Sequence, residues 1–152
     1  MFKSYADCTQ GKGSAALKEL IKNLPLNAKN PPSHNSQAPI FVPNYYFGLT
    51  DTCEFGVSSR HNSTGTAPWM LWIVVENMLG IRATPDGLKV APCMPDEWDH
   101  ARLHRQFKGS NYEIELRSGQ PGATLEITVN GEAISGTVLP TGASHYKVAV
   151  LF

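Results

Sequence analysis

A long apolar run lies between residues 63 and 80, with the sequence STGTAPWMLWIVVENMLG. Apolar side chains follow one another there with almost no polar face, and this pattern predicts a buried helix. Gly80 suits the left-handed position that closes such a helix. Two polar residues interrupt the run, so it is too short to span a bilayer. The small hydroxyl residues that precede the run are candidates for the N-cap: Ser63, Thr64 and Thr66.

The start of this predicted helix has the composition of an anion site. Thr64, Gly65 and Thr66 place two hydroxyls and a glycine at the positive end of a helix dipole. Glycine lets a ligand approach the backbone closely, and the first backbone N–H groups of a helix have no partner within the helix. Phosphate is the obvious candidate anion. An ordinary capped helix that binds nothing has the same sequence, so these residues alone leave both interpretations open.

Two shorter helices are predicted before this run, over residues 2–8 and 14–24, around a turn at residues 10–13. Ser14 is the candidate N-cap of the second helix. Two helices with no third helix nearby cannot close a bundle, so we expect this chain to begin inside a larger helical domain. One face of the second helix is apolar, because four residues recur at helical spacing: Ala16, Leu17, Leu20 and Ile21.

A proline- and asparagine-rich segment, residues 25–62, predicts a long irregular loop, and such loops are usually functional or disordered. Tyr45 and Tyr46 are candidates for a wall on which a sugar ring stacks, because the face of a pyranose is apolar. The alternative is that they pack the loop onto the helices. Near the end of the segment, Arg60 and His61 are hydrogen-bond donors suited to an anion or to sugar hydroxyls. The alternative for them is a solvated loop.

The second half of the chain alternates between apolar and polar residues, which predicts short β-strands. Asn130 and Gly131 form the strongest hairpin signal. Several short strands with turns between them indicate an antiparallel sandwich, so the predicted fold class is α+β. The predicted strands cover residues 88–90, 101–107, 112–117, 125–129, 133–139 and 146–151.

Composition limits the classes of partner. The chain has 152 residues, 41% of them hydrophobic, with 13 Lys and Arg against 13 Asp and Glu. The absence of net charge argues against a binder of nucleic acids or anionic membranes. Three cysteines lie far apart without a CxxC pair, which favours a reducing, cytoplasmic setting. No apolar segment typical of a secretion signal follows the first residues.

No residue of the chain has the surroundings expected of a catalytic group. His100 and His104 lack the glutamate of a zinc helix, and no third ligand is evident, so we expect no metal. No serine or cysteine lies in a nucleophile elbow. The carboxylates lack the apolar neighbours that raise the pKa of a general acid; they are Asp51, Glu54, Asp96, Glu97, Asp99, Glu113 and Glu115.

Three stretches taken together resemble glycoside hydrolase family 94, the inverting β-glucoside phosphorylases of the cellobiose, cellodextrin, chitobiose and β-1,2-oligoglucan types. They are QAPIFVPNYYFG at 37–48, STGTAPWMLWIVVENMLGI at 63–81, and TPDGLKVAPCMPDEWD at 84–99, which RQFKGSNYEIEL follows at 105–116. Each stretch alone is weak evidence, but the ordered set is specific. The resemblance extends over most of the chain from about residue 24.

This resemblance implies that residues 1–82 are the last helices of an (α/α)₆ barrel and residues 83–152 a small C-terminal β domain. The family reaction is phosphorolysis: an aspartic acid protonates the glycosidic oxygen, and phosphate attacks the anomeric carbon from the opposite face to give α-glucose 1-phosphate. The implied partners are a β-glucan oligosaccharide, inorganic phosphate as co-substrate without a cofactor, and an upstream barrel or a second copy. The general acid belongs upstream of this chain, so the chain alone is expected to be inactive.

Few family residues carry over to this sequence, and none of them is catalytic. The phosphate-binding Thr-Gly pair matches Thr64 and Gly65, and a side-chain amide that contacts phosphate matches Asn44. Asn62 stands where the family often has tryptophan, which changes the expected sugar subsite. Two alternatives stay open, a non-catalytic β domain that binds carbohydrate through the aromatic loop and a purely structural domain.

Overall fold

The computed structural model describes residues 1–24, 42–43, 45–49, 55, 57, 65–119 and 123–152. It begins with two packed helices, α1 (Phe2–Thr9) and α2 (Gly13–Ile21), which confirms the two predicted helices. The N-cap of α2 is Lys12 rather than Ser14, so that prediction was wrong. The Ser14 hydroxyl has other partners, because it lies 2.8 Å from an Asp96 carboxylate oxygen and accepts the Asp96 backbone N–H at 2.9 Å.

The predicted long helix begins as α3 (Thr66–Trp72) and continues as a π-helix, η1 (Ile73–Met78). Gly80 follows with φ +70°, as expected of a residue that closes a helix. The candidate caps Ser63 and Thr64 lie outside the described residues. Gly65 occupies the N-cap position, and no side-chain capping bond is found among the described residues.

Burial of this helix differs from the prediction. Met70 and Ile73 are buried as expected, but Leu71 is 67% exposed and Trp69 is 40% exposed. The buried residues belong to the cluster formed with α1 and α2, whereas no described segment covers Leu71. An apolar run therefore predicted the helix correctly but not which of its faces is covered within this chain.

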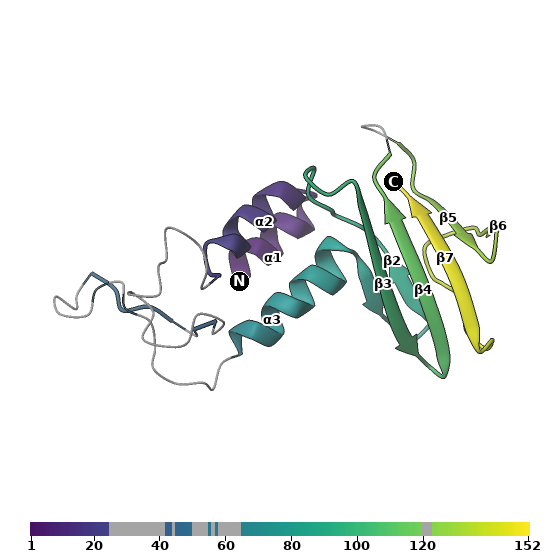
Figure 1. The fold of residues 1–152 in the computed structure, drawn as a ribbon, viewed down its shortest axis with the longest axis horizontal. Coiled ribbons are helices and arrows are strands. Elements are labelled where there is room, and N and C mark those ends of the chain that lie inside the picture. The colour runs from purple at the N-terminus through teal and green to yellow at the C-terminus, as the bar shows by residue number, and fades with distance from the viewer. Residues whose placement is uncertain (25–41, 44, 50–54, 56, 58–64, 120–122) are drawn as a thin grey trace.

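The β half contains a two-stranded and a five-stranded sheet. Figure 1 shows α3 leading into the β half beside β3, with β6 at the far edge. The small sheet pairs β1 (Ile81–Ala83) with β2 (Leu88–Val90) in antiparallel orientation. The large sheet has the order β3-β4-β7-β5-β6, with the strands β3 (His100–Phe107), β4 (Ser110–Arg117), β5 (Glu126–Val129), β6 (Glu132–Ala133) and β7 (His145–Leu151).

The five-stranded sheet is mixed rather than wholly antiparallel as predicted. Strands β4 and β7 pair in parallel, with Ile114 opposite Val148, while the other pairs are antiparallel. The cause is the connection from β6 to β7, which returns β7 between β4 and β5. The Tyr112 hydroxyl donates to the Pro140 carbonyl at 2.8 Å and holds this connection against β4. Alternation of side chains predicts the faces of a strand but not the direction of its neighbour.

The predicted strand over residues 133–139 is largely absent. Strand β6 ends at Ala133, and Gly136 has φ +88°, which interrupts extended structure. Val138 then forms an isolated bridge with Lys89 of the small sheet. The Asn130-Gly131 hairpin is confirmed: φ is +53° at the first residue and +89° at the second, as a two-residue hairpin turn requires.

Two apolar clusters form the core. One lies between the two sheets and includes the fully buried residues Ile81, Leu88 and Leu116. The other joins α1, α2 and the α3–η1 helix. Trp98 packs against both clusters and connects the helical and β halves. The division of the chain at residues 82 and 83 stays a prediction. Among the described helices, none is long and apolar enough to cross a membrane.

Candidate functional site

A cavity of about 390 Å³ lies where the start of α3 meets the aromatic loop and the first residues of the chain. It brings together Tyr45, Tyr46 and Gly65, three of the residues selected from the sequence. Tyr45 and Tyr46 are separated from Gly65 by a segment of which only part is described. The sequence alone did not predict that these residues line the same cavity. The remaining lining residues are Met1, Phe2, Asn23, Pro43, Thr66 and Trp69.

Gly65 forms an open edge of this cavity. Its φ of −78° and ψ of −12° are helical, and its carbonyl accepts the Trp69 backbone N–H at 3.1 Å. A Cβ added at Gly65 would meet no described atom within 4 Å. The position is therefore open to a ligand approaching the backbone, and an alanine there needs no unusual backbone conformation.

Aromatic rings form much of the cavity wall. Tyr45 is half exposed, and its ring lies edge-on to Phe47 with the centroids 5.6 Å apart. The Phe47 backbone N–H donates to the Val57 carbonyl at 2.9 Å, so the loop doubles back on itself there. Across the cavity, the rings of Phe2 and Trp69 lie 5.2 Å apart. Apolar ring faces next to a helix start suit a ligand that combines a sugar with an anion.

A polar network connects the aromatic residues on this side of the cavity to the β half. Trp72 contacts Trp69 edge-on at 5.4 Å, and its indole N–H donates to Glu76 at 2.9 Å. Arg105 of β3 donates to the other oxygen of Glu76 at 3.1 Å and also to the Ile81 carbonyl. Because these groups are partly buried, their mutual bonds fix the orientation of Trp72. Sequence reasoning missed this network, although the four-residue spacing of Trp72 and Glu76 on one helix face was visible.

Several predicted site residues cannot be placed. Asn44, Arg60, His61 and Thr64 lie outside the described residues, so their phosphate- and sugar-binding roles stay predictions. Thr66, the other hydroxyl residue of the predicted anion site, lines the cavity and has an interaction partner.

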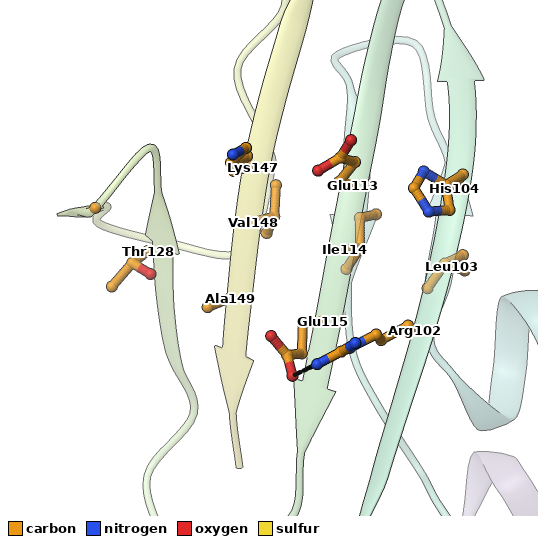
Figure 2. A pocket seen from close by; sticks show the side chains of 11 residues that line it. Arg102, Leu103, His104, Glu113, Ile114, Glu115, Thr128, Lys147, Val148 and Ala149 are labelled. Atoms are coloured by element: carbon orange, nitrogen blue, oxygen red, sulfur yellow. Dashed lines mark hydrogen bonds and ion pairs between the residues drawn. The ribbon is translucent and has the colours of Figure 1, made fainter.

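A second hollow, on the open face of the large sheet, is lined by charged residues (Figure 2). Arg102 donates to Glu115 at 3.0 Å, and Arg117 donates to the same oxygen at 2.8 Å. The hydrogen bonds from Arg117 and Arg102 hold the pKa of Glu115 below its usual range. A general acid needs a raised pKa, so the environment of Glu115 is the opposite of what that role requires.

The expectation that His100 and His104 hold no metal ion stays a prediction. His100 and His104 are both exposed on one face of β3, in agreement with the expected strand. In the described ranges, no three His, Cys, Asp or Glu side chains gather so as to hold a metal ion. His100 contacts Asp99 at 3.0 Å and lowers the pKa of that carboxyl.

Comparison with known proteins identifies the relatives of this chain. Residues 81–135 match the C-terminal domain of glycosyl hydrolase family 65. The chain is 48% identical over 153 residues to the 3-O-beta-D-glucopyranosyl-beta-D-glucuronide phosphorylase of Paenibacillus borealis, an alignment that covers 99% of this chain and 20% of that enzyme. It is 33% identical over 141 residues to the solabiose phosphorylase of the same organism, covering 91% of this chain and 18% of the enzyme.

A third relative extends the match to a fungus. The cellobionic acid phosphorylase of Neurospora crassa is 35% identical over 114 residues, covering 73% of this chain and 13% of that enzyme. The chain thus spans at most about a fifth of the length of these curated relatives. All three are named as phosphorylases, in agreement with the family that the sequence motifs resemble. The chain therefore belongs to the glycoside phosphorylases of the glycoside hydrolase family 94 type.

Proposed function

We propose that this chain is the C-terminal part of an inverting β-glucoside phosphorylase and that it supplies part of the phosphate site. The cavity that joins Gly65 to Tyr45 and Tyr46 is the observation that supports this proposal most strongly. An open glycine at a helix start suits an anion, and the neighbouring rings suit a sugar. Phosphate and sugar must lie side by side for phosphorolysis, because phosphate attacks the sugar directly.

In the proposed reaction, a general acid outside this chain donates its proton to the glycosidic oxygen. A phosphate oxygen attacks the anomeric carbon from the opposite face as the glycosidic bond breaks, so a β-linkage gives an α-sugar 1-phosphate. Asn44, Thr64 and Gly65 would hold the phosphate, with backbone N–H groups and the helix dipole favouring its charge. Tyr45 and Tyr46 would stack on the sugar, and Arg60 and His61 would donate to its hydroxyls or to the phosphate.

The uncovered side of α3 fits the same proposal. Leu71 and Phe2 are 67% and 77% exposed, and the Trp69 ring is partly exposed next to Phe2. Apolar groups gathered in this way usually mark a surface that another element covers. We propose that helices of the upstream barrel cover it, in the remaining four-fifths of a protein of the relatives' length.

The test is steady-state phosphorolysis by the full-length protein with variants Thr64→Ala and Gly65→Ala. Thr64→Ala removes one hydrogen bond to a charged ligand, which costs about 1.5–3 kcal/mol, so we expect the KM for phosphate to rise roughly 10- to 100-fold. Gly65→Ala keeps the backbone N–H but adds a methyl group in the path of the ligand, so it should also raise this KM. Thr128→Ala on the open face of the large sheet is the matched control and should leave this KM unchanged. An unchanged phosphate KM in both site variants would remove these residues from the phosphate site.

The same assay distinguishes the phosphorylase from the alternative of a non-catalytic carbohydrate-binding domain. A carbohydrate-binding domain would bind β-glucan oligosaccharides equally well with and without phosphate, and its protein would not release a sugar phosphate. Tyr45→Phe keeps the ring, whereas Tyr45→Ala removes it. If stacking holds the sugar, only the alanine variant should raise the KM for the oligosaccharide.

A further inference from the structure

Two cysteines from distant parts of the chain meet at the junction of the helical and β halves. Cys8 lies on α1, and Cys93 lies in the segment that follows β2. Both side chains belong to the helical apolar cluster, interact with each other, and line one cavity of about 460 Å³. Cys8 is 8% exposed and Cys93 is half-buried, so Cys93 is the more exposed residue of the pair.

Backbone contacts hold Cys93 in place on both sides. Its N–H donates to the Met78 carbonyl at the end of η1 at 2.8 Å. Gly13 at the start of α2 packs directly against the Cys93 backbone. A Cβ at Gly13 would lie 2.5 Å from the Cys93 carbonyl oxygen, so only glycine permits this approach. The position of Cys93 is therefore fixed by its contacts with α2 and η1.

The two thiols differ in their electrostatic environment. The hydrogen bond from Cys8, with a smaller contribution from the Gly13 N–H, lowers the pKa of Cys93 to about 7 despite its burial. The same bond raises the pKa of Cys8, and burial and the negative charge of Asp7 act in the same direction. These directions favour Cys93 as the nucleophilic thiolate and Cys8 as the second thiol of the pair.

The cavity outside the thiols carries cationic groups. Arg82 and Lys89 line it, and the Lys89 residue is exposed. The carboxylate in the lining, Glu76, already accepts from Trp72 and Arg105. Asp7, whose charge acts on Cys8, pairs with Lys3 at 2.7 Å. Arg82 and Lys89 therefore offer two cationic groups that a small anionic molecule in this cavity can contact.

We propose that Cys8 and Cys93 form a thiol–disulfide exchange site that takes a small anionic disulfide as its oxidant. The Cys93 thiolate attacks one sulfur of the small disulfide, breaks its S–S bond and releases one small thiolate. Cys8 then attacks the Cys93 sulfur of this mixed disulfide and releases the second small thiol, and the Cys8 proton ends on a released thiol. The two cysteines lose two electrons, and the small disulfide gains them. This site does not depend on the proposed phosphorylase activity.

Formation of the Cys8–Cys93 bond would join α1 covalently to the segment between β2 and β3. Both helices that line the candidate site near Gly65, α1 and α3, contact this junction through the helical cluster. A reversible bond here therefore ties the first helix of the chain to the β half. It closes a long loop, which stabilises the folded protein mainly by restricting the unfolded chain.

Peptide mapping of the full-length protein after treatment with glutathione disulfide tests the bond. Trypsin places the three cysteines in separate peptides: residues 4–12 contain Cys8, residues 90–102 contain Cys93, and residues 30–60 contain Cys53. We expect a cross-linked species of peptides 4–12 and 90–102 that a dithiol reductant separates. Full alkylation of both cysteines after this treatment would overturn the proposal, and so would a persistent glutathione adduct at Cys93 without the cross-link.

A matched pair of variants tests the role of Cys8. Cys8→Ser keeps a hydrogen-bond donor to the Cys93 thiolate, whereas Cys8→Ala removes it. In the alkylation rate of Cys93 against pH, we expect a midpoint near 7 for the wild type. The midpoint should move toward the ordinary cysteine value of about 8.5 in Cys8→Ala, and less far in Cys8→Ser. Identical midpoints in the three proteins would contradict activation by Cys8.

A comparison of an anionic with a cationic disulfide tests the proposed preference for an anionic oxidant. Glutathione disulfide is anionic, whereas cystamine is a cationic disulfide of similar reactivity. We expect faster cross-linking by glutathione disulfide, and Lys89→Gln should reduce that difference because it removes a cation from the cavity. Equal rates with the two disulfides in the wild type would exclude an anionic oxidant as the preferred class.

Discussion

Substitution of Gly80 by alanine tests the junction between the helix and the β half. Gly80 has φ +70°, and an added Cβ would lie 2.1 Å from the Ala91 carbonyl oxygen and 2.5 Å from the Pro92 nitrogen. These are backbone atoms, so the segment after β2 must move away. That movement breaks the hydrogen bond from the Ala91 N–H to the Gly80 carbonyl, which is 2.8 Å long.

The expected loss combines a conformational and a packing contribution. A left-handed conformation costs a non-glycine residue about 1–2 kcal/mol. A broken backbone bond costs about 1 kcal/mol, and forced repacking about 1–3 kcal/mol. We therefore expect Gly80→Ala to lower the free energy of unfolding by roughly 4 kcal/mol, a large share of the stability of a typical domain.

Gly109→Ala is the matched control, because Gly109 has φ +79° and an added Cβ there would meet no described atom within 4 Å. It should show the conformational cost alone, about 1–2 kcal/mol. The assay is urea-induced unfolding followed by tryptophan fluorescence and far-UV circular dichroism. Equal losses in the two variants would refute the assignment of steric contact between Gly80 and Ala91.

Three further substitutions test the packing and the charges. Arg105→Ala removes the ion-pair partner of Glu76. Because the pair is partly exposed, we expect the free energy of unfolding, measured by thermal unfolding, to fall by about 1–2 kcal/mol. An unchanged free energy of unfolding would show that the ion pair does not stabilise the fold. Leu116→Ala, at a fully buried position, should lower the free energy of unfolding measured with urea by about 2–5 kcal/mol. A decrease of less than about 1 kcal/mol would contradict the core location of Leu116. Glu115→Gln should lower stability at pH 7. The pKa of Glu115 is lowered in the folded state, so its contribution is present above the ordinary value of 4.5 and lost as the pH falls below it. A difference from the wild type that persists at pH 2 would contradict this origin.

Local patterns predicted the elements well, because their physical causes are local. The Asn130-Gly131 turn requires two positive φ angles, and these two residues adopt them at low cost. Alternation along β4 predicted its buried face correctly. The parallel pairing of β4 with β7 was not predictable in this way, because it depends on the path of the connection held by Tyr112 and Pro140.

The candidate site was only partly predictable for the same reason. The helix-start signature singled out Gly65, and the aromatic loop singled out Tyr45, and the structure places both on one cavity. Trp69 was interpreted as buried core, yet it lines the cavity, because no described segment covers that side of α3. Spacing along the sequence likewise gave no indication that Cys8 and Cys93 meet, since their contact depends on the packing of α2 onto the segment after β2.

The phosphate dependence of glycosidic bond cleavage by the full-length protein tests the central claim most directly. The assay incubates the protein with β-linked disaccharides, with and without inorganic phosphate, and follows products by ³¹P NMR. We predict an α-sugar 1-phosphate that forms only with phosphate, and a raised phosphate KM in Gly65→Ala with the fold retained. Cleavage by water at the same rate without phosphate, or a phosphate KM in Gly65→Ala equal to that of the wild type, would contradict the account.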